Sequence, residues 1–383
     1  MSASLSSNSA LHRELSLIIW SGSILLLVFA IFFIKIWPVD QILNLAVQSC
    51  VIWLLCLSRT SSWLELNRVT KNAPLYATFG WANRLSLLRA WLIALTAGFI
   101  FQPNLSENIL YLPALSYFLA AVIDRIDGFV ARVSRQQSLL GEKLDTEFDA
   151  LGLLVAPLLA VWIGQIHWSY LSVSLAYYLY QAGLHWRKRN NLAIYPLPKN
   201  PERRAIAGFQ MGFLAVVLWP ILAPPATTIA GFAFMFPLLV GFLIDWLTSN
   251  GTIRRDKPEI RERLEFWYSL IQSPLLPAMR IGLFLLMILS FYHRADFLAD
   301  SLNQLTLNVI MFVCVVLILL GYVGRLSALI LSCLYAYFML QIQPGIVDTL
   351  ILMLSIWLMQ LGTGKYSLAL WDDRWVKRYD GAA

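Results

Sequence analysis

The sequence predicts an all-α membrane protein that crosses the bilayer about 12 times. Three observations support this fold class: 59% of the 383 residues are hydrophobic, only 13% are charged, and long apolar runs recur from end to end. The mean hydropathy of +0.66 is too high for an ordinary soluble protein. Because a helix needs about 20 mostly apolar residues to cross a bilayer, each of these runs predicts one spanning helix.

The predicted spans are apolar stretches of helical length. In chain order they lie near residues 15–36, 41–57, 88–102, 108–124, 147–166, 168–185, 206–223, 227–247, 276–292, 304–321, 326–341 and 346–361. Two charged stretches, 58–84 and 250–265, separate them into groups of two, six and four. We therefore predict three modules: a two-helix extension at 1–75, a six-helix core at 76–265 and a four-helix module at 266–383.

The basic residues predict the orientation in the membrane, since Lys and Arg concentrate in cytoplasmic loops. With the N-terminus inside, the outer loops retain only Lys35 and Arg294. An even number of spans then places both termini in the cytoplasm. The net charge of +7 indicates a face beside anionic lipid rather than a nucleic-acid partner. The first span lacks a small-residue cleavage site, which is typical of an anchor and not of a removed signal peptide.

Residues 124–149, DRIDGFVARVSRQQSLLGEKLDTEFD, carry the strongest functional signal in the chain. Five of them lie at i, i+3, i+4, i+7 and i+8, on one face of a helix: Asp124, Asp127, Gly128, Ala131 and Arg132. After a gap of eight residues, three more lie at i, i+4 and i+8: Gly141, Asp145 and Asp149. Packing the two faces together brings four carboxylates beside small residues and one arginine.

Such a group of carboxylates requires compensation. Two carboxylates about 5 Å apart repel by about 3 kcal/mol at an effective dielectric of 20. Either some of the four stay protonated or a divalent cation binds them, and Mg²⁺ and Mn²⁺ prefer oxygen ligands. The alternative is a solvated hairpin at the membrane surface, where acidic and basic residues at these spacings are common. Eight positions in phase on adjacent helices favour the metal site.

The pattern D-x2-D-G-x2-A-R-x8-G-x3-D-x3-D resembles the signature of the CDP-alcohol phosphotransferases, and all eight positions match. The resemblance covers about residues 76–265 and implies a six-helix core that uses Mg²⁺ or Mn²⁺, as two ions. It implies that Asp124, Asp127 and Asp145 bind metal, and that Asp149 is the catalytic base and a further ligand. It also implies that Gly128, Ala131, Arg132 and Gly141 line the CDP site.

The segment ANRLSLLR, residues 82–89, resembles the N-x-L-T-x-x-R sequence at the start of the first core helix of that family, with Ser86 in place of Thr. We expect Asn83 to make a supporting polar contact near the metal site. We interpret Arg89 as an anchor at the membrane interface.

A basic segment, residues 185–208, lies on the predicted cytoplasmic side between two core helices. Its lysines and arginines are Arg187, Lys188, Arg189, Lys199, Arg203 and Arg204. They are suited to a phosphorylated acceptor, and equally to fixing the topology or contacting lipid head groups. Lys199 and Arg203 are the first pair to test.

The last four spans resemble the DoxX-like family of small four-helix membrane proteins. This resemblance depends on GYVGRLSALIL at 321–331 and GTGKYSL at 362–368. It implies a redox or quinone-related role, but the sequence shows no ligand set there. A module for packing or assembly is the favoured interpretation.

The sequence therefore predicts an integral enzyme of a bacterial inner membrane, with its active site on the cytoplasmic side. The predicted reaction transfers a phospho-alcohol group from a CDP-alcohol such as CDP-diacylglycerol to a hydroxyl acceptor, releases CMP and serves phospholipid biosynthesis. The family resemblance also implies a homodimer. The alternatives are a CDP-amino-alcohol donor with a lipid acceptor, an intramembrane prenyltransferase and a non-enzymatic membrane protein.

Overall fold

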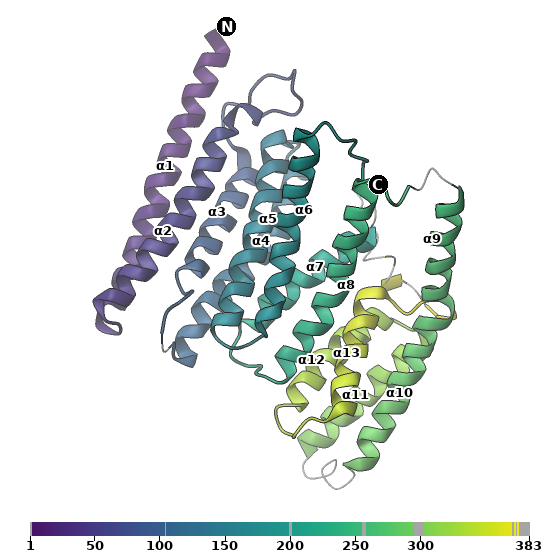
Figure 1. Ribbon diagram of the computed structural model, residues 1–383. Helices are drawn as coiled ribbons and strands as arrows, with labels where there is room; N and C mark the ends of the chain where they lie inside the picture. Colours follow the sequence, from purple (N-terminus) through teal and green to yellow (C-terminus); the bar gives the residue numbers. More distant parts are fainter. Residues whose placement is uncertain are drawn as a thin grey trace. The chain divides into compact units, whose positions relative to one another are not determined.

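The computed structural model describes residues 2–103, 105–198, 201–254, 258–294, 302–369, 371–372 and 374. Throughout this described part the regular elements are helices (Figure 1), and one isolated β-bridge joins Tyr322 to Ala369. The all-α fold class is thereby confirmed. The chain divides into two compact units, one of Met1–Gly164 with Leu214–Pro220, the other of Gln165–Phe213 with Ile221–Ala383.

Unit 1 is built around one buried helix. Its helices are α1 (Ser2–Phe32), α2 (Val39–Ser62), α3 (Gly80–Ala97), α4 (Glu107–Val133) and α5 (Leu139–Trp162), with short 3₁₀ turns at Phe33–Lys35 and Leu64–Leu66. α3 packs against α2, α4 and α5, and 12 of its 18 residues are buried. Small residues such as Ala90 and Ala94 allow the neighbouring helices to approach closely.

The N-terminal helices belong to the same unit as the signature helices. The Trp91 indole on α3 donates a hydrogen bond of 3.0 Å to the Gly22 carbonyl on α1. At the other end of α3, Glu14 of α1 pairs with Arg84 at 2.8 Å and accepts a hydrogen bond from the Phe79 amide. α1 and α2 therefore pack onto the helix that supports the signature. The three-module division remains a prediction.

Unit 2 contains most of the remaining helices. They are α6 (Leu171–Arg189), α8 (Ala226–Ser249), α9 (Pro258–Leu270), α10 (Leu276–His293), α11 (Leu302–Leu320), α12 (Gly324–Phe338) and α13 (Ile346–Leu361), with a 3₁₀ turn at Trp168–Tyr170 and a π-helical turn at Ile271–Leu275. α7 (Pro201–Val217) begins in this unit, and its last four residues belong to unit 1. α8 packs against α6, α12 and α13, and the Trp357 indole donates to the Ala233 carbonyl at 2.9 Å.

The last four helices enclose a buried ion pair. Asp348, in the first turn of α13, is fully buried and accepts hydrogen bonds from Arg294 at 2.7 and 2.9 Å. The Tyr335 hydroxyl and the Gly345 amide donate to the same carboxylate, each at 2.7 Å. This network satisfies the charge inside the module and joins α12, α13 and the end of α10. It therefore supports a packing role for these residues.

Within the described residues, five helical segments are long and apolar enough to cross a membrane: Ser9–Lys35, Val39–Ser62, Glu107–Val133, Ala226–Ser249 and Pro258–His293. Each of the twelve predicted stretches falls on a helix, but the count of about twelve spans is not confirmed. α5 carries five charged residues in its first half, and α12 and α13 are only 15 and 16 residues long. The apolar helices indicate an integral membrane protein.

Replacing Asp348 by Asn is expected to lower the free energy of unfolding by about 2 kcal/mol, because Arg294 loses its buried counter-ion. The measurement is the thermal unfolding midpoint of the purified protein in detergent. Asp40→Asn is the matched control, since Asp40 is exposed and its replacement changes stability by at most about 0.5 kcal/mol. Equal midpoints for the two variants would contradict a stabilising role of the network.

Candidate active site

The two halves of the signature lie on consecutive helices. Asp124 to Arg132 occupy the last turns of α4, which ends at Val133, and Gly141 to Asp149 occupy the first turns of α5. The Ser138 hydroxyl accepts a hydrogen bond of 3.0 Å from the Gly141 amide and so caps the N-terminus of α5. The gap of eight residues therefore contains the turn between the two helices.

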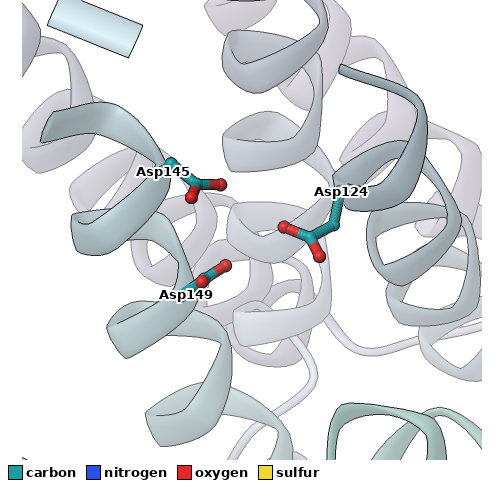
Figure 2. A group of neighbouring side chains, drawn as sticks. All are labelled: Asp124, Asp145 and Asp149. Carbon is teal, nitrogen blue, oxygen red and sulfur yellow. The ribbon is translucent and has the colours of Figure 1, made fainter. Parts of the chain in front are cut away.

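Three of the four aspartates converge. Asp145 and Asp149, one turn apart on α5, face Asp124 on α4 (Figure 2), and one carboxylate oxygen of each lies within 4.8 Å of the others. We call Asp124, Asp145 and Asp149 the aspartate cluster. Their side chains are 14%, 54% and 36% exposed, respectively. The cluster is therefore accessible from its Asp145 side.

The fourth aspartate is held separately. Asp127 is buried, and its carboxylate accepts a hydrogen bond of 2.8 Å from the Ser86 hydroxyl on α3. It does not belong to the group of three convergent oxygens. Ser86, which stands where the family sequence has Thr, thus anchors one residue of the signature to the buried helix.

Arg89 lies among the carboxylates of the aspartate cluster. Its guanidinium forms an ion pair with Asp124 and lies 3.3 Å from both Asp145 and Asp149. Its side chain is only 2% exposed. The interpretation of Arg89 as an interfacial anchor did not anticipate this position. The available signal was an arginine followed by the apolar residues AWLIAL, because a charge in apolar surroundings requires a partner.

The residues of the aspartate cluster fit a divalent cation. Three carboxylate oxygens from two helices form a hard-oxygen donor set of the kind that Mg²⁺ and Mn²⁺ accept, with waters or phosphate oxygens completing the shell. One oxygen of Asp149 is buried and makes no hydrogen bond in the described part of the chain, although it lies 3.3 Å from the Arg89 guanidinium. A buried carboxylate oxygen left in this way is well suited to coordinate an ion.

Asn83 supports the turn between the signature helices. Its amide donates to the Ser138 hydroxyl at 3.2 Å and to the Asn67 side chain at 3.1 Å. A Cβ at Gly141 would lie 2.8 Å from the Asn83 amide oxygen, so this close approach requires glycine at 141. Asn83 therefore contacts the start of α5. The ion pairs and hydrogen bonds described above for the carboxylates are made by Arg89 and Ser86 instead.

Asn67 is a supporting residue that the sequence analysis missed. It is fully buried and donates a hydrogen bond of 2.9 Å to the Thr78 carbonyl. It lies in the charged stretch before the predicted core, and a single asparagine in a polar loop gives no sequence signal. The segment that joins α2 to α3 thus holds the turn of the signature in place.

The remaining signature residues lie near the end of α4. Gly128 and Ala131 are half-buried, and Arg132 is exposed. Among the residues that the structure describes, none pairs with the Arg132 guanidinium. Its fork of donors is therefore available to an anionic ligand.

The basic segment is partly engaged in structure. Arg187 donates to the backbone carbonyls of Ala193 at 2.7 Å and Asn250 at 3.2 Å, which fixes the segment after α6. Arg203 pairs with Asp245 at 3.0 Å. Lys199 lies outside the described residues. For Arg187 these contacts favour a structural role over binding of an acceptor.

Comparison with known proteins identifies one domain of the chain. Residues 79–247 match the model of the CDP-alcohol phosphatidyltransferase family. The chain therefore contains a CDP-alcohol phosphatidyltransferase domain. The matched range includes all eight signature residues, Asn83 and Arg89, whereas Asn67 precedes it. No curated protein and no solved structure matches the chain.

This domain supports a transferase of phosphate-containing groups in lipid synthesis, acting on a CDP-alcohol and an alcohol acceptor in the membrane. The aspartate cluster is compatible with the metal that such enzymes use. The resemblance of the last four helices to the DoxX-like family remains a prediction.

Replacing Asn67 by Ala is expected to destabilise the protein by about 1–3 kcal/mol, because the buried Asn83 amide loses a partner. The midpoint of thermal unfolding in detergent measures this effect, and transfer activity is expected to fall with it. Asn72→Ala makes the same chemical change at an exposed position of the same segment and serves as the control. If both variants unfold like the wild type, Asn67 does not support the signature.

Proposed function

We propose that the protein transfers a phosphatidyl group from CDP-diacylglycerol to a hydroxyl acceptor and releases CMP. The observation that carries this proposal is the convergence of Asp124, Asp145 and Asp149 within the family domain. Such a cluster is suited to divalent cations and hence to a diphosphate. The activity belongs to the transferases of substituted phosphate groups, in phospholipid biosynthesis.

The proposed roles follow from the carboxylates. Asp124, Asp127 and Asp145 would bind the metal, and Asp149 would be a further ligand. The metal would be Mg²⁺ or Mn²⁺, as two ions. A divalent ion bound there neutralises charge on the diphosphate and makes CMP a better leaving group. For Asp127 to bind the metal, its carboxylate must contact the ion while keeping the hydrogen bond from Ser86, or after losing it.

Asp149 is the proposed general base. Its carboxylate accepts the proton of the acceptor hydroxyl as the hydroxyl oxygen attacks the β-phosphorus of the donor. The new P–O bond forms while the bond between the β-phosphorus and the bridging oxygen breaks, so CMP leaves with the bonding electron pair. The buried Asp149 Oδ1 supports this role because it makes no hydrogen bond in the described chain, although it lies 3.3 Å from the Arg89 guanidinium.

Gly128, Ala131, Arg132 and Gly141 are proposed to line the CDP site. The small residues allow the nucleotide to approach the backbone, and the exposed Arg132 guanidinium matches phosphate geometry. Asn83 acts on this site through the turn at Ser138.

CDP-diacylglycerol is the proposed donor because the apolar helices of an integral membrane protein suit acyl chains. The acceptor is a soluble hydroxyl compound such as glycerol phosphate, inositol phosphate or serine. A CDP-amino-alcohol with a lipid acceptor is the second candidate. Assay of CDP-diacylglycerol and CDP-choline, each with a panel of acceptors and with lipid products separated by chromatography, decides between them.

Two other classes remain as competitors. Intramembrane prenyltransferases also bind diphosphate through aspartates and metal, but their motifs lie far apart in sequence, whereas here both halves adjoin. A non-enzymatic membrane protein is disfavoured by the intact signature of eight residues. We further propose a location in the bacterial inner membrane, with the active site and both termini in the cytoplasm, and a homodimeric assembly.

Purified protein with Mg²⁺ or Mn²⁺ is expected to release CMP from CDP-diacylglycerol in the presence of its acceptor, and Asp145→Asn is expected to lower the rate at least about 100-fold. Glu142→Gln is the matched control, because this exposed carboxylate lies on the same helix, outside the aspartate cluster. CMP is quantified by chromatography.

Equal loss of CMP release in both variants would indicate general damage to α5. Binding of CDP-diacylglycerol by the wild type without turnover on any acceptor would favour the non-enzymatic alternative.

A further inference from the structure

Arg89 has no part in the roles assigned above, yet it contacts every member of the aspartate cluster. We propose that Arg89 is a built-in counter-ion, which holds the aspartate cluster together before metal binds and competes with the metal for the same carboxylate oxygens. It is a positioning residue. The proposal depends on the metal dependence proposed above and deepens it.

The charge of Arg89 is permanent, and its burial is costly. A guanidinium does not lose its proton in proteins, and a side chain that is 2% exposed has little access to water. A buried charge of this kind persists only when it is paired. Its partners here are the same carboxylates that the metal needs, so the guanidinium and the metal depend on one set of oxygens.

The arrangement of helices explains why a counter-ion is needed at this position. Asp124 lies on α4, whereas Asp145 and Asp149 lie on α5. These two helices pack mainly against α3 and have few contacts with each other. Arg89 extends from α3 to both, and also donates to the Asp145 carbonyl at 3.2 Å. Without a cation between them, the carboxylates repel one another.

Two consequences follow. In the absence of metal, the wild-type protein keeps its carboxylates in place, because one positive charge is always present. When a divalent ion binds, it meets a cluster that is already partly neutralised, so its affinity is lower than three carboxylates alone would give. An ion that binds less tightly also dissociates more readily.

The test uses the full-length protein in detergent and Mn²⁺ alone as the probe, with free Mn²⁺ measured by its electron paramagnetic resonance signal. Arg89→Gln removes the charge and Arg89→Lys retains it. We expect Arg89→Gln to bind Mn²⁺ at least about tenfold more tightly than the wild type, and Arg89→Lys to remain within about threefold. The unfolding midpoint of Arg89→Gln is expected to fall in EDTA and to return toward the wild-type value in saturating Mn²⁺.

Equal or weaker Mn²⁺ binding by Arg89→Gln would overturn the proposal, since a side chain that only fills space gives no gain in affinity. Failure of Arg89→Gln to fold even in saturating Mn²⁺ would also overturn it, because the metal must be able to replace the lost charge. Asp145→Asn provides the control for binding at the aspartate cluster. If the wild type itself binds no Mn²⁺, the proposed metal dependence fails, which is a separate result.

Discussion

The mutual repulsion of carboxylates is the constraint on which this structure depends. Asp124, Asp145 and Asp149 approach within 4.8 Å of one another at the ends of two helices that have few contacts with each other. The buried helix α3 makes this possible: it supplies the packing surface for both helices, the Arg89 charge among the carboxylates and the Ser86 hydroxyl that holds Asp127. The helix α3 therefore supports both halves of the signature.

The sequence was sufficient to predict the two helices of the signature and the approach of three of its four aspartates, because both follow from local periodicity. Spacings of three and four residues placed the signature on two helices, and the structure has them as α4 and α5. The convergence of Asp124 with Asp145 and Asp149 was expected for the same reason. Asp127 is different, since its burial against Ser86 depends on the rotation of α4 relative to α3, and a pattern within one helix does not contain that angle.

The residues that the sequence did not reveal act between distant segments. Asn67 is separated from Asn83 by a loop, and Arg89 is separated by 56 residues from its partner Asp145. Neither has a repeating pattern around it. The number of membrane spans does not follow from composition for a related reason. The helices α3 and α5 carry the charged and polar groups that the site needs in place of some apolar residues, so composition alone does not classify them as spans.

The contact of Trp357 with the Ala233 carbonyl bears on how the chain can be divided. α8 is the last helix of the matched family range, yet one of its faces packs against α12 and α13. A shortened chain ending near residue 265 would leave that face bare, and lipid or another copy would have to cover it. The helix α8 is thus shared between the family domain and the C-terminal helices. Cleaving the chain after α8 would therefore not yield two independently folded domains.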